Sequence, residues 1–229
     1  MGIRSWTAAR SSEGRLRRAF FDRPATGLAR ALLGARLRVA GPNGARTARL
    51  VEVEAYLRGD PASHAYRGRT RRNRSMFRSP GTLYVYRIHQ VVCANLVARR
   101  GEAVLLRAAA IEGDGDPREG RGPGRLCRAL GITIADDGAT VVGPGRFVVY
   151  GPARSPRVVR RGPRIGIRRA AERPLRFWLE GEPSVSRPRR TTASASPTRS
   201  RDGGRYPRSR TRSRPSSGGG RRGGRTAGR

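Results

Sequence analysis

The sequence predicts a single α+β domain, followed by a basic C-terminal segment without a core of its own. Three observations support this fold class. Residues 49–56 alternate apolar and polar side chains with the period of two that is typical of a β-strand. Residues 83–86 and 91–97 are strand-like runs joined by a short connection, as in a β-hairpin. Short stretches with helical spacing accompany these strands.

The N-terminal end contains an expected arm and the first helix. Residues 1–18 are polar and weakly patterned, so we expect a loose arm there. A short helix is expected within residues 19–33. Pro24, Thr26 and Gly27 indicate a turn, and apolar residues at helical spacing follow it.

Strands dominate the central region. Residues 37–39 and 50–56 are expected to be strands joined by a turn at residues 41–44. Residues 58–80 are dense in arginine and poor in apolar side chains, which predicts a long loop. The remaining expected elements are a hairpin over residues 83–97 with its tip at 88–90, a strand at 103–107, a short helix at 124–130 and a last strand at 175–179.

The composition changes at the end of the domain, which we expect to span residues 19–186. Residues 187–229 contain 14 arginines and one acid, Asp202, and carry +13 of the net charge of +34. They contain no Leu, Ile, Val, Phe or Trp, so buried apolar surface cannot offset the entropy lost on ordering. We expect a disordered basic arm for nucleic acid. A nonspecific solubilising tail and a translation-frame artefact are the alternatives.

The charge of the chain points to a polyanionic partner. Lysine is absent, so all 50 basic residues are arginines, against 16 acids. The guanidinium group binds phosphate oxygens in a bidentate manner, which an ammonium group cannot do. Nucleic acid is therefore the first candidate partner, and an anionic membrane surface is a distant second.

Cysteine and histidine are too few for a metal site. The chain has two of each, Cys93, Cys127, His64 and His89, and no metal-ligand spacing can be built from them. The start of the chain has no apolar signal region, and no run is long enough to span a membrane. We expect an intracellular protein of the bacterial cytoplasm or nucleoid, with both thiols free and no membrane partner.

One face of the strand at residues 50–56 is chemically unusual. Glu52, Glu54 and Tyr56 share it, with no basic residue between them. One interpretation is a solvated outer face. The other is a carboxylate held beside an aromatic wall, as a site for a flat, electron-poor ligand requires.

Several motifs follow one another in a specific order. They are Val-Glu-Val-Glu54-Ala-Tyr56, Ser63-His64, Arg72-Asn73-Arg74-Ser-Met76-Phe77, Pro80-Gly-Thr-Leu-Tyr84-Val-Tyr86, Cys93-Ala-Asn95, Val104-Leu-Leu-Arg107-Ala and Pro123-Gly-Arg-Leu-Cys127-Arg-Ala-Leu. In this order and at these spacings, residues 19–185 resemble the alkyladenine (3-methyladenine) DNA glycosylase family. The resemblance implies a curved, mostly antiparallel sheet edged by short helices. A hairpin carrying His89 would project from it into the minor groove.

The resemblance also implies a reaction. A monomeric enzyme of this family flips a damaged purine out of double-stranded DNA and hydrolyses its N-glycosidic bond, with alkylated and also deaminated purines as substrates. Glu54 would be the general base that activates water for attack on C1′. An alkylated purine already carries positive charge and leaves readily, so one carboxylate can orient water and stabilise the oxocarbenium-like transition state. Glu52 is then either a second acid or, as we favour, the partner of an arginine.

Four further residues match the family's base-binding pocket. Tyr56 would stack on one side of the flipped purine, and His64 and Tyr86 on the other, because a base offers two π faces. Asn95 matches the pocket residue that disfavours guanine by crowding its 2-amino group.

The other matching positions concern DNA. Arg107 matches an arginine near the catalytic water and the DNA backbone, and Arg69 and Arg72 match phosphate contacts. His89 takes the place of the tyrosine that commonly fills the gap left by the flipped nucleotide. It is followed by Gln90 instead of glycine. The return strand of the hairpin is one residue shorter than usual, so the geometry of the tip remains open. Ser184 also replaces a common aromatic residue.

The absence of lysine bears on the mechanism independently of any family. Without a lysine Schiff base, a combined glycosylase and lyase mechanism has only the N-terminal amine as a nucleophile. This favours a monofunctional hydrolase that leaves an abasic site and needs no metal or cofactor. The alternative function is a non-catalytic, arginine-rich nucleic-acid-binding protein, although such a protein gains nothing from Glu54 beside Tyr56. A degenerate family member kept for binding alone is a third possibility.

Overall fold

The computed structural model describes residues 14–113, 115–152 and 158–186. The expected C-terminal tail lies outside the described residues, as do residues 1–13 of the expected N-terminal arm. Leu16, which was also assigned to the arm, is buried in the core, and its backbone N–H donates to the carbonyl oxygen of Val149 at 2.8 Å. The last residues of the expected arm therefore pack with the domain.

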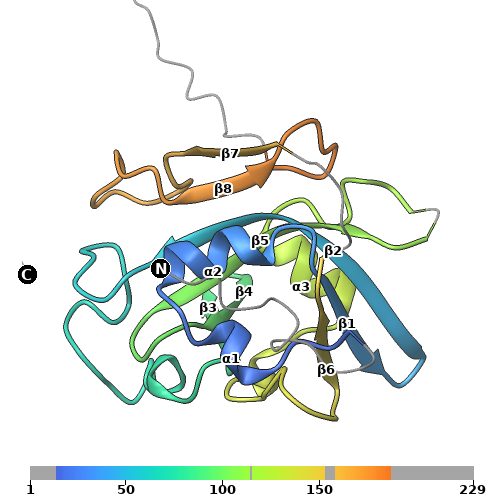
Figure 1. The fold of residues 1–229 in the computed structure, drawn as a ribbon, viewed down its shortest axis with the longest axis horizontal. Helices are drawn as coiled ribbons and strands as arrows, with labels where there is room; N and C mark the ends of the chain where they lie inside the picture. The colour runs from blue at the N-terminus through green and yellow to red at the C-terminus, as the bar shows by residue number, and fades with distance from the viewer. Residues whose placement is uncertain (1–13, 114, 153–157, 187–229) are drawn as a thin grey trace, which may run out of the picture. The chain divides into compact units, whose positions relative to one another are not determined.

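One antiparallel sheet organises the described part of the chain (Figure 1). Its strands run in the order β3-β4-β5-β2-β1-β6, and β8 pairs with both β2 and β7. The strands are β1 (Arg36–Gly41), β2 (Gly44–Tyr56), β3 (Leu83–Ile88), β4 (Val91–Val97), β5 (Ala103–Ile111), β6 (Phe147–Tyr150), β7 (Val159–Gly162) and β8 (Arg176–Leu179). The expected α+β domain with a curved antiparallel sheet is confirmed.

Strand β2 lies at the centre of this sheet. One edge pairs with β5 from Ala48 to Tyr56. The other pairs first with β1 and then, from Glu52 to Glu54, with β8. The β2–β5 register shifts twice around Glu52, leaving Val51 and Arg107 without direct partners opposite them. Such bulges bend a strand and re-aim side chains. Here they flank the acidic part of β2.

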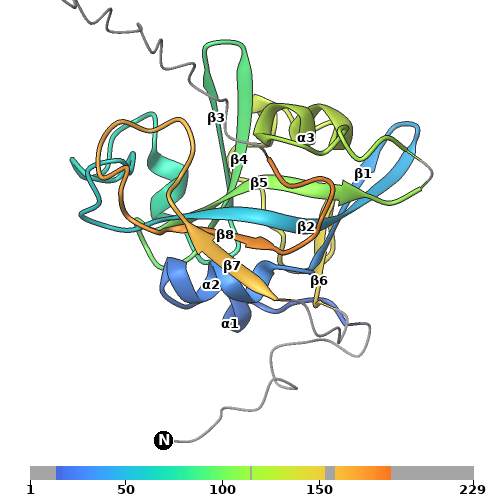
Figure 2. The ribbon, with the colours of Figure 1, turned by 90° about the horizontal axis from the view of Figure 1, so that it is seen from above.

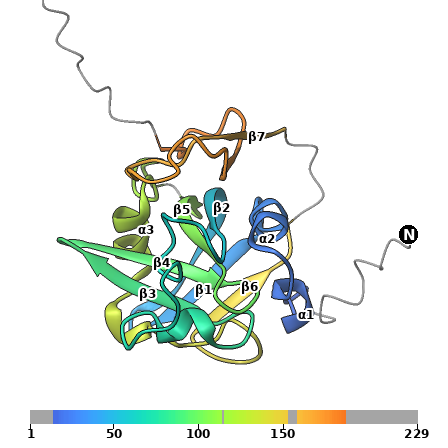
Figure 3. The same cartoon turned by 90° about the vertical axis from the view of Figure 1, so that its left-hand side faces the viewer.

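Helices cover both faces of this central strand pair. Helix α2 (Ala25–Leu32) and helix α3 (Pro123–Leu130) lie on opposite sides of β2 and β5 (Figures 2 and 3). As a result, β2 is fully buried from Leu50 to Ala55, including both glutamates. Of the two interpretations of this strand face, the solvated outer face is therefore wrong. The sequence does not show which helices will cover a strand.

The first helical region is divided. Helix α1 (Arg18–Phe21) is separate from α2, and Pro24 stands at the N-terminal boundary of α2, where proline needs no N–H partner. Thr26 and Gly27 belong to α2, so the turn expected at these two residues is wrong. The apolar spacing beyond them does form the buried face of the helix, through Leu28 and Leu32.

Some short elements had no counterpart in the sequence prediction. They are β6, β7 and two 3-10 turns, Arg74–Phe77 and Ile134–Asp136. Each is three or four residues long, which is too short for a periodic pattern to emerge. None of the helices described is long and apolar enough to cross a bilayer.

The expected hairpin is present and projects from the body of the domain (Figure 2). Its register is regular from Leu83–Leu96 to Ile88–Val91, which leaves only His89 and Gln90 in the turn. The short return strand therefore produces a tight two-residue connection. His89 adopts a φ of 52°, a left-handed conformation in which histidine is among the enriched non-glycine residues.

Candidate active site

A cavity of about 370 Å³ lies beside the acidic part of β2. It is bordered by β2, β3, β4 and β5, the start of α3, and the β2–β3, β3–β4 and β7–β8 connections. Seven of the nine site residues expected from the sequence line it: Glu54, Tyr56, His64, Tyr86, His89, Asn95 and Arg107. The structure thus brings together residues that are up to 53 positions apart in the chain.

Glu54 is held by three groups of the protein. Its Oε2 accepts a hydrogen bond from the Tyr56 hydroxyl at 3.0 Å, and its Oε1 accepts one from the Ile165 backbone N–H at 2.9 Å. Arg107 Nε lies 3.3 Å from the same Oε1. The carboxylate is fully buried from bulk solvent yet borders the cavity. Its orientation is therefore fixed from both oxygens.

The surroundings of Glu54 act on its basicity in opposite directions. Burial raises the pKa of Glu54 above its ordinary value, because the charged form loses hydration. The Arg107 charge and the hydrogen bonds from Ile165 and Tyr56 pull the pKa back down, while the neighbouring Glu52 raises it. A carboxylate with a raised pKa that is still stabilised as an anion is suited to accept a proton from water.

Tyr56 forms one aromatic wall of the cavity. The Arg164 guanidinium carbon lies 4.6 Å from the centre of its ring. Arg164 is itself buried, forms an ion pair with Asp60, and donates to the Ala55 carbonyl oxygen at 3.1 Å. Because Ile165 follows directly, the same anchor fixes the N–H that reaches Glu54.

The other wall is an aromatic cluster of His64, Tyr84 and Tyr86. The His64 and Tyr86 ring centres are 4.5 Å apart, and those of Tyr84 and Tyr86 are 5.4 Å apart. His64 Nδ1 lies 2.8 Å from the Tyr84 hydroxyl oxygen. Desolvation lowers the pKa of His64, which favours the neutral ring at neutral pH. Tyr84 was not among the expected site residues, although its position beside Tyr86 in a strand motif carried the signal.

Asn95 and Cys93 close the cavity from β4. Asn95 is buried, and its side-chain amide donates to the Tyr84 carbonyl oxygen at 3.0 Å. This bond orients the amide toward the hairpin backbone. Cys93 is buried beside Tyr86, and burial raises the pKa of its thiol, so the group stays protonated and inert.

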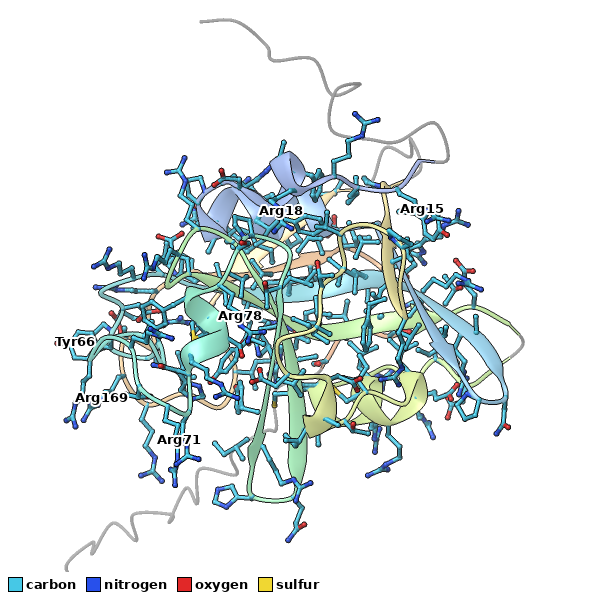
Figure 4. The ribbon with its side chains drawn as sticks, turned by 90° about the horizontal axis from the view of Figure 1, so that it is seen from below. Arg15, Arg18, Tyr66, Arg71, Arg78 and Arg169 are labelled. Atoms are coloured by element: carbon cyan, nitrogen blue, oxygen red, sulfur yellow. The ribbon has the colours of Figure 1, made fainter. Side chains whose placement is uncertain are left out.

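Three of the expected DNA contacts lie on the exterior. Arg69 and Arg72 are exposed in the loop between β2 and β3 and are not part of the cavity lining, whereas His89 is exposed at the cavity rim. Arg71 of this loop and Arg169 lie toward the side from which the hairpin projects, while Arg15 and Arg18 lie opposite (Figure 4). The projecting hairpin therefore stands beside exposed positive charge.

The segment Ile165-Gly166-Ile167 was missed by the sequence prediction, although it lines the cavity. Its contribution to Glu54 is a backbone N–H, which every residue except proline carries. No residue type or spacing could have singled it out.

Glu52, two residues before Glu54, has different surroundings. Arg176 Nε donates to its Oε1 at 2.5 Å, and the Ser186 backbone N–H donates to its Oε2 at 2.6 Å. Arg107 Nε is also near, 3.5 Å from Oε1. The expected pairing of Glu52 with an arginine is confirmed, although the pair is buried rather than on the strand surface. Glu52 does not line the cavity.

Metal ligands are not clustered in the part of the chain that the structure describes. No group of three or more His, Cys, Asp or Glu side chains there could hold a metal ion.

Comparison with known proteins identifies the family. Residues 19–183 match the family model described as methylpurine-DNA glycosylase (MPG). A protein of Methanoculleus marisnigri is 44% identical over 188 residues, covering 74% of this chain and 97% of the relative. A protein of Mycolicibacterium paratuberculosis is 42% identical over 191 residues, covering 74% and 91%. Both bear the name "Putative 3-methyladenine DNA glycosylase". The chain therefore belongs to the methylpurine-DNA glycosylase family and is a DNA glycosylase, a hydrolase of DNA repair.

Proposed function

We propose that this glycosylase binds double-stranded DNA as a monomer, flips an alkylated purine into the 370 Å³ cavity and hydrolyses its N-glycosidic bond. The observation that carries the proposal is Glu54. It is a buried carboxylate at the cavity wall, with a raised pKa and with both oxygens held in place. A purely structural carboxylate has no need of a neighbouring cavity.

The cavity walls suit a flat, cationic base. Tyr56 stacks on one face of the flipped purine, and His64 and Tyr86 cover the other. The ring of a neutral His64 does not repel a positively charged base, as a protonated histidine would. Stacking is tolerant of substituents, so deaminated purines also fit this mode of binding. Asn95 crowds the position of a 2-amino group and disfavours guanine.

Hydrolysis needs one base and little acid catalysis. Glu54 accepts a proton from water while the water oxygen forms a bond to C1′. The C1′–N bond breaks, and its electron pair neutralises the positive charge of the alkylated base. The Glu54 carboxylate faces the oxocarbenium-like sugar, which it stabilises electrostatically. Arg107 holds Glu54 from the side of β5 at 3.3 Å and reaches toward the DNA backbone.

The hairpin supplies the step before the chemistry. His89 enters the minor groove and fills the gap that the flipped nucleotide leaves, which offsets part of the lost stacking. Arg69 and Arg72 hold phosphates beside it. The tight two-residue turn keeps the histidine ring at the extreme end of the projection.

The decisive experiment is Glu54→Gln. We expect the single-turnover rate of base release from alkylated duplex DNA to fall about 10²–10⁴-fold, while DNA affinity is retained. Glu180→Gln, at an exposed ion pair with Arg160, is the matched control and should leave the rate unchanged. An unaltered rate in Glu54→Gln would overturn the proposal. No release by the native protein would favour the non-catalytic alternative.

The product should be an intact abasic site, because the chain has no lysine to form an imine with the sugar. The measurement is a denaturing gel run before any alkaline or heat treatment. Efficient strand cleavage that borohydride traps as a covalent complex would contradict a monofunctional mechanism.

A further inference from the structure

Arg107 is shared by two carboxylates. Its Nε lies 3.3 Å from Glu54 Oε1 and 3.5 Å from Glu52 Oε1, on the side of β5 where the register shifts. Both glutamates are fully buried. The Nε group makes no well-aligned hydrogen bond within the described residues, so it is committed to neither carboxylate. One cation therefore interacts with both carboxylates at nearly the same distance.

Glu52 has further partners besides Arg107. Arg176 Nε and the Ser186 N–H occupy one oxygen each, and a second Arg176 nitrogen donates to the Ser186 carbonyl oxygen at 2.9 Å. Arg176 is also fixed by the Trp178 ring, whose centre lies 4.5 Å from its guanidinium carbon. Ser186 lies beyond residues 19–183, which match the family model. A segment outside that match thus completes the surroundings of Glu52.

Glu54, in contrast, has few charged neighbours. The ionisable groups that face it are Arg107 from β5, Glu52 and Tyr56 from β2, Tyr86 from β3 and Cys93 from β4. Of these, only Arg107 is a cation and only Glu52 is another carboxylate. The Tyr and Cys pKa values are raised by burial, so these three groups remain neutral around neutral pH. Among the ionisable groups that face Glu54, the charges that act on its pKa are therefore those of one arginine and one glutamate.

We propose that Glu52 is a positioning residue for base release. Its negative charge, held in place by Arg176 and Ser186, offsets part of the positive potential that Arg107 produces at Glu54. This inference rests on the proposed role of Glu54 as the general base. Glu52 keeps Glu54 basic by opposing the Arg107 charge with its own, and it does so without touching the substrate.

The test is the pH dependence of base release by the full chain. A general base must be ionised, so the single-turnover rate rises with pH through the pKa of Glu54. In Glu52→Gln the competing charge is gone and Arg107 acts on Glu54 alone. The pKa of Glu54 then falls, and the acid limb of the profile moves to lower pH. The plateau rate should also fall several-fold, because a weaker base accepts a proton less readily.

Two further variants separate this effect from a loss of stability. Glu52→Gln combined with Arg176→Met removes both charges of the buried pair, which restores much of the stability lost in Glu52→Gln. The acid limb of the pH–rate profile of this double variant should still lie at lower pH than that of the native protein. Glu182→Gln breaks a different ion pair, with Arg49 at 2.8 Å, around a carboxylate whose side chain is 5% exposed. It should lower stability without moving the limb.

The outcomes are distinguishable. If Glu52→Gln and the double variant keep the acid limb of the native protein, Glu52 is only structural and this inference fails. If Glu54→Gln releases base as fast as the native protein, the proposed function itself fails. An equal shift in Glu182→Gln would assign the effect to stability and would also overturn the inference.

Discussion

The two glutamates of β2 are equally buried, lie two residues apart and share one strand face, but their neighbourhoods differ. Around Glu52, each oxygen accepts a hydrogen bond of 2.5–2.6 Å from a group of the C-terminal segment, and the residue does not line the cavity beside Glu54. Around Glu54, the bonds are 2.9–3.0 Å long and the carboxylate borders the cavity. Burial alone therefore does not identify a candidate general base. What distinguishes the two is whether the protein leaves space for a ligand beside the carboxylate.

The largest expected effect tests the structural side of this comparison. Glu52→Gln leaves Arg176 buried without its counter-ion, and breaking a buried pair in this way costs about 3–5 kcal/mol of the free energy of unfolding. Chemical denaturation monitored by tryptophan fluorescence measures the loss. Glu180→Gln, which breaks an exposed pair, should cost no more than about 1 kcal/mol. Equal stabilities of these two variants would remove the distinction between the neighbourhoods.

A substitution at the cavity rim tests whether nucleotide flipping depends on a residue other than the two buried glutamates. His89→Ala should lower base release from duplex DNA on the order of tenfold, since flipping costs a few kcal/mol and the inserted ring offsets part of it. Release from single-stranded DNA, where no gap needs filling, should change little. His89→Tyr should retain or improve duplex activity.

The adjacent tip residue supplies the control for this prediction. Gln90→Ala alters the same turn without removing a ring and should leave the duplex rate close to that of the native protein. If His89→Ala lowers base release equally on duplex and single-stranded DNA, the variant has a folding defect. If neither rate changes, His89 is an ordinary turn residue.

Replacing the two glutamates by glutamine should change the thermal stability of the protein in opposite directions. Because burial raises the pKa of Glu54, its charged form destabilises the fold at any pH above that pKa. Glu54→Gln removes this charge and should raise Tm at neutral pH, whereas Glu52→Gln lowers it. The gain should vanish below the pKa of an unperturbed glutamate, about 4.3, where Glu54 is protonated in both states. A lower Tm for Glu54→Gln at pH 7 would contradict the idea that Glu54 is held at a cost to stability.

The smallest expected effect concerns one hydroxyl group. Tyr56→Phe keeps the stacking ring but removes the hydrogen bond that lowers the pKa of Glu54. The acid limb of the pH–rate profile should therefore move to higher pH, opposite to the shift expected for Glu52→Gln. Tyr84→Phe removes a hydroxyl group from the same cavity that contacts His64 instead, and its limb should stay in place.

The sequence predicted those parts of the molecule that depend on residue type and local order. The alternation around Glu54 located the central strand, and the two strand-like runs at residues 83–86 and 91–97 located the hairpin. Of the cavity residues, only Glu54 and Tyr56 stood out by their own chemistry, as a carboxylate and an aromatic ring on one strand face. The family resemblance placed them in one site.

The remaining features depend on contacts that no local pattern encodes. Arg164 and Asp60 are 104 positions apart, and nothing in either segment marks them as a buried pair. The bulges around Glu52 arise from the mismatch of two strands and not from either strand alone. Covering helices convert an alternating strand into a fully buried one, which only the assembled fold reveals.

The bonds between Glu52 and the C-terminal segment also have a consequence for synthesis. Arg176 and Ser186 follow Glu52 by 124 and 134 positions, so they leave the ribosome long after the central strand. At about 5–20 residues per second, the delay is on the order of ten seconds. Until then, the middle of the sheet contains a carboxylate that lacks both of its hydrogen-bond donors, Arg176 and Ser186, and burying it would be costly. Nascent chains should therefore keep β2 open to water, and the domain should close only when its last residues are made.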